Sequence, residues 1–152
     1  MTYMNHDEPY SDEYLQGILK SVKTIAMVGA SPDKTKFSYG VLRVLHETGF
    51  EMIPVNPRAD VEEIRGIKVY NSLAEIDRPV DMVEVFRRAK DLPSVALEAV
   101  DIGAKVLWGQ IGVTHPDAAK IAEDAGMKVV MNRCPKIELF RPFWKPKLRP
   151  TI

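Results

Sequence analysis

Five short apolar runs recur along the chain, and each is followed by a stretch in which the apolar residues have helical spacing. A short apolar run bounded by turn residues is typical of a buried strand. Strands that alternate with helices indicate parallel strands joined by crossover helices. The expected strands are residues 24–29, 51–56, 80–86, 105–109 and 127–131.

The helices between these strands carry their own start and stop residues. Gly49, Gly103 and Gly126 each stand shortly before a strand, where a glycine commonly ends a helix. Ser38 and Thr114 are expected to cap two of the helices at their N-termini. The expected elements are helices from Ser38 to Gly49, over 92–102 and over 115–125, an opening helix over 11–22 at the sheet edge, a strand-like piece over 67–70 and a helical turn from Ser72. Together they predict a Rossmann-like three-layer α/β/α fold with a five-stranded, mainly parallel, doubly wound sheet.

Composition narrows the class of protein. The 152 residues include 21 basic and 21 acidic side chains, a formal net charge of zero that gives no general attraction to nucleic acid or to an anionic membrane. The length predicts one domain over 1–152, with a flexible N-terminus over 1–10 and a proline-rich tail over 142–152. Cys134 is the single cysteine, and no apolar run approaches the roughly 20 residues of a membrane span. We therefore expect a cytoplasmic protein, a monomer or a weak homodimer, with no metal site because the histidines lack ligand spacing.

The junction between the first strand and the next helix, residues 28–40, is the best candidate for a binding site. In a doubly wound sheet this helix points its N-terminus at the crevice beyond the strand ends, where free N–H groups favour an anion such as phosphate. Gly29 and Ala30 leave room near the backbone, and Lys34 and Lys36 add positive charge. The alternative is a tight turn with solvated lysines, because only one glycine of the dinucleotide fingerprint is in place.

The residues at the end of the second strand limit which cofactors fit the site. A conventional NAD site has an acidic residue here for the ribose hydroxyl, whereas this chain has Asn56, Pro57 and Arg58. A cation would suit a phosphorylated ribose, which NADP and coenzyme A both carry. An Asn-Pro turn with an exposed arginine is the structural alternative.

Five stretches of the chain carry a resemblance to a known family: residues 28–31, 38–41, 53–57, 80–88 and 132–138. With these stretches the chain resembles the small stand-alone coenzyme A-binding proteins, which are similar to the coenzyme A-binding domain of the succinyl-coenzyme A synthetase α subunit. The resemblance implies coenzyme A lying across the strand ends. The synthetase's phosphorylated histidine has no counterpart here, so the resemblance implies binding without a catalytic residue.

Carried over by position, the resemblance implies that residues 29–40 hold the phosphates and that Phe86 and Arg87 close the adenine side. Pro54, Asn56 and Pro57 would line the adenosine site. The full expected set of cofactor-binding residues is Gly29, Ala30, Ser31, Lys36, Ser38, Tyr39, Gly40, Pro54, Asn56, Pro57, Arg58, Phe86 and Arg87.

Two other functions stay open at this point: an NADP-linked oxidoreductase, and a regulatory module that binds a protein partner on the same fold. A smaller hypothesis concerns Cys134, which Arg133 precedes. A nearby cation favours a thiolate, so Cys134 is a candidate for a mixed disulfide with the coenzyme A thiol. The alternative is a buried, unreactive cysteine, the more common situation. Trp108, at the end of the fourth strand, is expected in the core rather than as a stacking platform for a ligand.

Overall fold

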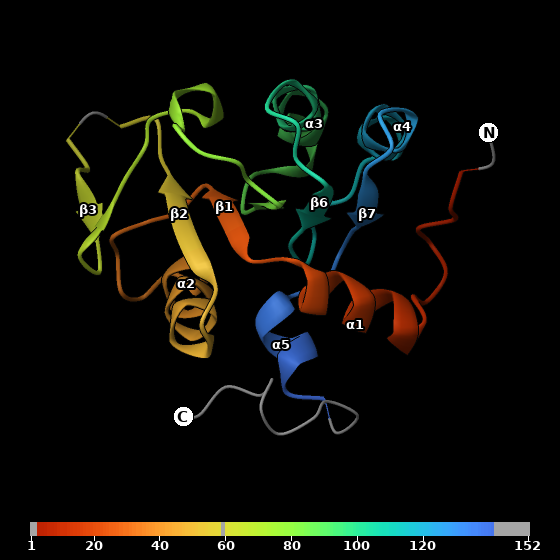
Figure 1. Cartoon of the computed structure of the whole chain (residues 1–152), viewed down its shortest axis with the longest axis horizontal. Helices are drawn as coiled ribbons and strands as arrows, with labels where there is room; N and C mark the ends of the chain where they lie inside the picture. The colour runs from red at the N-terminus through yellow and green to blue at the C-terminus, as the bar shows by residue number, and fades with distance from the viewer. Residues whose placement is uncertain (1–2, 59, 142–152) are drawn as a thin grey trace.

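One parallel sheet forms the centre of the molecule. The computed structural model describes residues 3–58 and 60–141. Five strands lie in the order β2-β1-β5-β6-β7, all parallel (Figure 1). They are β1 (Thr24–Val28), β2 (Glu51–Val55), β5 (Met82–Val85), β6 (Val106–Gly109) and β7 (Lys128–Val130). The five expected strands are confirmed, and the chain reverses its direction across the sheet at β1, which makes the end of β1 a topological switch point.

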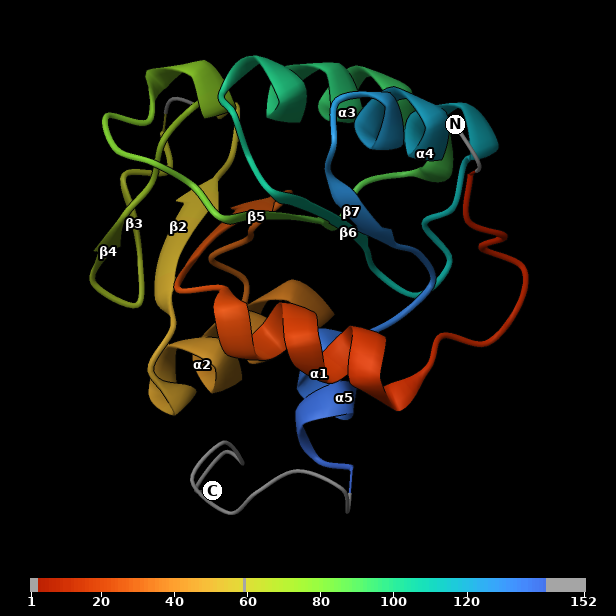
Figure 2. The ribbon, with the colours of Figure 1, turned by 45° about the vertical axis from the view of Figure 1, so that its right-hand side comes forward.

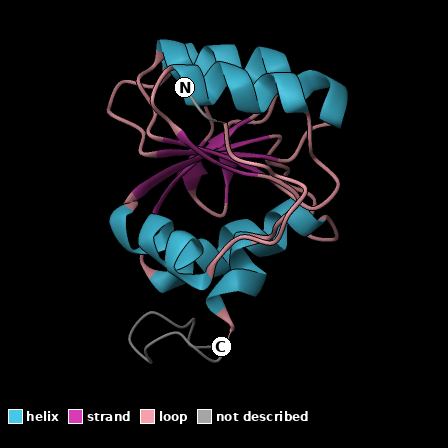
Figure 3. Ribbon diagram, turned by 90° about the vertical axis from the view of Figure 1, so that its right-hand side faces the viewer, coloured by secondary structure: helices cyan, strands magenta, loops and turns pink. Residues whose placement is uncertain are grey.

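Helices cover both faces of this sheet, as the apolar patterns predict (Figure 3). One face carries α1 (Asp12–Ser21), α2 (Phe37–Thr48) and α5 (Pro135–Leu139), and the other carries α3 (Leu92–Asp101) and α4 (Pro116–Asp124). Alternate residues of each strand enter two separate apolar clusters. Val83 and Val85 of β5 pack under α3, whereas Met82 packs with Trp108 under α1 and α5. Trp108 is fully buried and its Nε1 donates to the carbonyl of Arg133 at 2.9 Å, so its predicted core role is confirmed.

Two predicted helix caps are wrong. Helix α2 begins at Phe37 with Lys36 as its N-cap, and Ser38 lies buried inside the first turn. The tight turn at Asp33, whose carbonyl accepts from the Lys36 amide at 3.1 Å, leads into the helix before Ser38 is reached. At α4 the N-cap is His115 rather than Thr114. Its ring nitrogen accepts from the Asp117 amide at 3.2 Å, a role usually taken by an oxygen.

The segment between β2 and β5 contains a small antiparallel hairpin of β3 (Glu63–Ile64) and β4 (Ile67–Lys68). Two 3₁₀ turns flank β5: η1 (Leu73–Glu75) precedes it and η2 (Ala89–Asp91) follows it. Just after β4, Tyr70 lies along the outer edge of β2. Its amide donates to the carbonyl of Pro54 at 3.0 Å, and its carbonyl accepts from the amide of Asn56 at 2.9 Å. The hairpin therefore covers the end of the β2 edge.

Helix α1 packs on one face of the sheet and also contacts the β7 edge (Figure 2). The sequence predicted the contact with a sheet edge. The Tyr14 hydroxyl donates to the Val129 carbonyl at 2.8 Å and accepts from the Val129 amide at 3.0 Å. The Tyr10 hydroxyl accepts from the Met131 amide at 2.8 Å. Tyr14 of α1 thus satisfies backbone groups that β7 presents outward, and Tyr10, just before the helix, does the same for Met131 just after the strand.

Within the described residues, no helix has the length and apolar character needed to cross a bilayer.

Candidate functional site

Gly29 lies where β1 meets β5, and the reason for glycine there is close backbone approach. Its φ is +91°, and a Cβ added to it would lie 2.3 Å from the carbonyl oxygen of Phe86. The amides of Gly29 and Ala30 both donate to the carbonyl of Val55, at 3.1 and 3.3 Å. The sequence-based explanation, that these two residues leave open backbone for a pyrophosphate, is therefore corrected: the space is used by the end of β5, and Ala30 is buried.

The available donors lie a few residues further along the same junction. In the described part of the chain, the amides of Ser31, Lys34, Phe37 and Ser38 have no hydrogen-bond partner. The first turn of a twelve-residue helix contributes two of them, which suits an anion. Asp33 stands among these donors, and the side-chain and backbone hydrogen bonds from Thr35 hold the pKa of its carboxyl below the ordinary value. The unpartnered amides and the lysines of this junction therefore surround one negative charge, that of Asp33.

Asn56 and Arg58 at the end of β2 have protein partners. The Asn56 side-chain amide donates to the Ala30 carbonyl at 2.8 Å and accepts from the Arg58 amide at 2.9 Å, so it joins the ends of β1 and β2. Arg58 pairs with Asp60 at 2.7 Å. The strand end itself carries no carboxylate, as the sequence shows, but Asp60 further along the chain reaches Arg58. Both side chains are about two-thirds exposed, and such pairs contribute about 0–1 kcal/mol, so an incoming phosphate can compete for Arg58.

A small cavity opens at this sheet edge on the side of α3, and we call it the α3-side cavity. Its volume is about 200 Å³, and it lies beyond the ends of β1 and β2. Two of the expected site residues, Pro57 and Arg87, line it. Arg87 faces Asp91 at 3.6 Å, and Asp91 also pairs with Arg88. The other lining residues include Val28, Val55, Ser72 and Ser94.

A larger cavity, the α2-side cavity, lies on the opposite side of the Gly29–Phe86 contact. Its volume is about 530 Å³, and it lies beyond the ends of β5 and β6 between α2 and α5. Lys36, Gly40 and Phe86 of the expected set line it. Cys134 lies in its wall and is 5% exposed, so the expected burial of this thiol is confirmed. The mixed disulfide with coenzyme A stays a prediction. Mass spectrometry of the protein oxidised in the presence of coenzyme A tests it, and the absence of an adduct on Cys134 would contradict the prediction.

Some expected residues line neither cavity. Pro54 and Ser38 are buried, and Tyr39 of α2 packs against the apolar cluster on this face of the sheet, with the Arg65 guanidinium 5.9 Å from its ring centroid. Conversely, the site list from sequence lacks Gln110, Ile111, Lys136 and Ile137, which all line the α2-side cavity. Their common signal is position, because each follows the carboxyl end of β6 or β7, where ligands of parallel sheets bind.

Glu84, two residues before Phe86, is a fully buried carboxyl in the middle of the sheet. It lies in register with Met27 and Trp108, and neither of its oxygens has a hydrogen-bond partner among the described side chains. Burial raises its pKa well above the ordinary value, so the carboxyl is held in its neutral form. It borders neither cavity directly.

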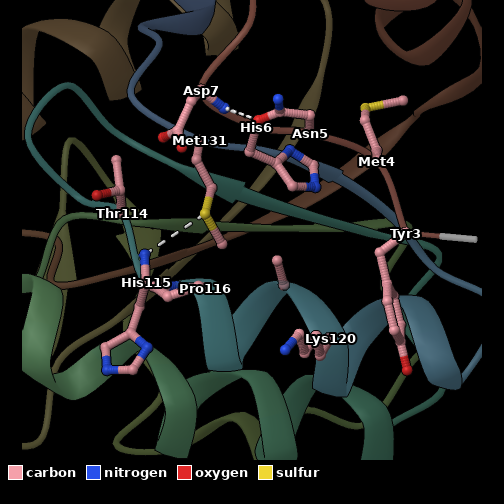
Figure 4. Close-up of a pocket in the computed structure, with 11 residues that line it drawn as sticks. Tyr3, Met4, Asn5, His6, Asp7, Thr114, His115, Pro116, Lys120 and Met131 are labelled. Atoms are coloured by element: carbon pink, nitrogen blue, oxygen red, sulfur yellow. Dashed lines mark hydrogen bonds between the residues drawn. The ribbon is translucent and has the colours of Figure 1, made fainter.

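A third cavity, about 230 Å³, lies between the N-terminal segment and α4 (Figure 4). Residues 3–6, expected to be flexible, are bonded here: Tyr3 donates to Asp124 at 2.6 Å, and His6 contacts Glu123 and Tyr10. His6 and His115 both line this cavity, but their rings point apart in Figure 4. No group of three or more His, Cys, Asp or Glu side chains suited to a metal occurs in the described part of the chain.

A family model, related sequences and solved structures all match this chain. The sequence model of a family described as a CoA binding domain matches residues 23–139. The chain is 40% identical over 123 residues to the uncharacterised protein YneT of Bacillus subtilis, covering 81% of this chain and 90% of YneT. It is 38% identical over 100 residues to the α subunit of the ADP-forming acetate–CoA ligase I of Pyrococcus furiosus. That match covers 59% of this chain but only 22% of the ligase subunit.

Among solved structures, a hypothetical protein from Pyrococcus horikoshii superposes with a TM-score of 0.82 at 35% identity. The match covers 91% of this chain and 96% of that protein. A protein from Thermus thermophilus gives a TM-score of 0.79 at 36% identity, covering 85% and 96% of the two chains. The similarity therefore extends over nearly the whole of three proteins and over a fraction of a larger ligase subunit.

Proposed function

This chain belongs to the CoA-binding domain family, and from that premise we propose that it binds coenzyme A or an acyl derivative across the carboxyl ends of β1, β2 and β5. We propose further that it does so without self-contained catalytic machinery. The chain spans 22% of the ligase subunit it matches, so the ligase reaction itself is not carried over.

The observation that carries this proposal is the pair of cavities on the two sides of the Gly29–Phe86 contact. Coenzyme A has a compact nucleotide end and a long pantetheine arm. The α3-side cavity, which Pro57 and Arg87 border, suits the adenosine, and the larger α2-side cavity suits the arm. The diphosphate would then pass over the junction where the amides of Ser31 and Phe37 are unpartnered.

Charge supports the same orientation. Arg58 and Arg87 both stand near the proposed adenosine end; Arg58 pairs with the exposed carboxylate of Asp60, and Arg87 faces the largely buried carboxylate of Asp91, which is 23% exposed. The 3′-phosphate of coenzyme A carries more charge than one carboxylate and forms stronger hydrogen bonds with a guanidinium. We propose that it takes over Arg58 from Asp60.

Calorimetry with coenzyme A, dephospho-coenzyme A, NADP and NAD tests this function. We expect the tightest binding for coenzyme A, and at a ligand concentration 100 times Kd a stabilisation of about 2.7 kcal/mol in thermal unfolding. Absence of coenzyme A binding, or a preference for NADP, would refute the proposal and in the second case favour a redox enzyme.

A variant separates the phosphate contact from general binding. Arg58→Ala should weaken coenzyme A by roughly tenfold, the value of one charge-assisted contact, and leave dephospho-coenzyme A unchanged. Arg43→Ala is the matched control, because Arg43 is also an arginine paired with a carboxylate but lies on α2 away from both cavities. Equal losses for both ligands in Arg58→Ala would remove Arg58 from the site.

A further inference from the structure

We propose that the α2-side cavity receives the acyl chain of an acyl-coenzyme A, so that the preferred ligand is a thioester with an apolar acyl group rather than free coenzyme A. This inference rests on the proposed function, because the cavity is placed at the end of the pantetheine arm. It goes further by naming the class of ligand and the part of the protein that selects it.

The rim of this cavity is unusually apolar for exposed surface. Phe37, Ile111 and Ile137 border it and are 88%, 57% and 53% exposed. They come from α2, from the loop after β6 and from α5, so distant parts of the chain bring them together. Single exposed apolar residues are normal on a protein surface, whereas several around one cavity mark a binding surface.

A buried acceptor lies in the wall of the same cavity. Gln110 is 9% exposed, and its Oε1 has no hydrogen-bond partner among the described residues. A buried amide oxygen without a donor is unfavourable, so a ligand N–H that reaches it is favoured. The pantetheine arm carries two amide N–H groups ahead of the thioester. Gln110 therefore suits the arm, with the apolar rim beyond it for the acyl chain.

Charge favours an anionic ligand in this cavity, and the position of Lys36 beside the proposed phosphate site sets the direction of that ligand. Lys36, the N-cap of α2, borders the cavity next to the proposed phosphate site, and Lys136 borders it from α5. None of the described residues that line the cavity is acidic. An anionic ligand with an apolar end matches this arrangement, because its charge stays near Lys36 while its chain extends toward Ile137.

The competing occupant is a second copy of this chain, which would cover the same exposed side chains with its own apolar surface. The unpartnered acceptor of Gln110 and the adjoining phosphate-binding donors favour a polar, anionic ligand over an apolar protein face. Self-association is therefore treated as an outcome that overturns the proposal.

The test is calorimetry of the full chain with coenzyme A and with its acetyl, butyryl, hexanoyl and octanoyl thioesters. A fully buried methylene is worth about fourfold in affinity, and the cavity is open on one side, so we expect about twofold for each added methylene. Affinity that is flat along the series, while coenzyme A itself binds, would overturn this inference and leave the proposed function standing. Absence of binding for every member would instead overturn the proposed function.

A double variant, Ile111→Ser with Ile137→Ser, locates the effect. Both side chains are exposed, so folding should be kept. Because the same cavity is proposed to hold the pantetheine arm, the affinity of each thioester is compared with the variant's own affinity for free coenzyme A. The increase with chain length should disappear. Leu97→Ser is the control, because Leu97 is 55% exposed on α3 and borders neither site cavity, and it should keep the increase.

Analytical ultracentrifugation of the same variants addresses the competing occupant. We expect the sedimentation of the ligand-free protein to be the same before and after the double substitution. A dimer that the double substitution abolishes, with affinity flat along the thioester series, would assign the surface to an interface between copies and overturn the proposal.

Discussion

At Glu84 a carboxyl is fully buried without a hydrogen-bonding side chain. In the unfolded chain it ionises near its ordinary pKa of 4.5, whereas in the folded protein its pKa is well above that value. Folding therefore takes up a proton once the pH exceeds 4.5. The contribution of this raised pKa is fully favourable below the unfolded value and is lost as pH rises toward the folded one.

Replacing Glu84 with glutamine tests this reasoning. Above pH 4.5 the unmodified protein should lose up to about 1.4 kcal/mol of unfolding free energy per pH unit from this group, until its folded pKa is reached. The Glu84→Gln variant has no such proton to take up. Urea unfolding at pH 5 and pH 8 should therefore show a smaller decline for the variant. Parallel declines in both proteins would contradict the assignment.

A substitution at Gly29 tests the close backbone approach between the ends of β1 and β5. The Gly29→Ala variant must place a Cβ 2.3 Å from the Phe86 carbonyl oxygen at a φ of +91°, so we expect a loss of about 3 kcal/mol or more of unfolding free energy. Gly40→Ala is the control. A Cβ at Gly40 meets nothing within 4 Å, and in a helix interior alanine should add roughly 0.5–1 kcal/mol. Equal effects of the two substitutions would show that the Gly29 turn tolerates a side chain.

At the level of elements, the contact between α1 and β7 depends on tyrosine hydroxyls. Tyr14→Phe would leave the amide and the carbonyl of Val129 without their partner, and we expect a cost of about 1–3 kcal/mol. Hydrogen exchange at the Val129 amide should accelerate accordingly. Tyr3→Phe, which removes an exposed hydroxyl bonded to Asp124, should change stability by less than about 0.5 kcal/mol. An unchanged exchange rate at Val129 would contradict this role for Tyr14.

Elements with strong local signals were predictable from sequence, and weaker ones were not. The five strands coincide with apolar runs in the sequence. Gly49, Gly103 and Gly126 were expected to end helices, and in the structure each has a left-handed φ, at +115°, +74° and +84°, which favours glycine. Helix α5 was missed because a five-residue helix shows too little of a helical period. The caps at Ser38 and Thr114 were wrong because the start of each helix depends on a neighbouring turn or ring rather than on the hydroxyl alone.

For the whole molecule, fold class was predictable, but the strand order rests on contacts between residues far apart in the sequence. Register pairs such as Val28 with Val55 and Val28 with Val85 place β1 between β2 and β5, and this order has no local signal. The same holds for the candidate site. Its β1–α2 junction could be found from the chain, whereas the α2-side cavity joins Lys36, Gln110 and Ile137 only after folding.

The outermost strands of the sheet have a consequence for the protein in a crowded solution. Tyr70 bonds the end of β2, where Pro54 also lacks an amide hydrogen. The Tyr14 hydroxyl bonds Val129 of β7, and the Tyr10 hydroxyl bonds Met131 just after that strand. A strand with free backbone groups is a template on which foreign chains can add and start aggregates. Because the end of the β2 edge and part of the β7 edge are engaged by the protein's own groups, the native fold offers less of such a template to foreign chains.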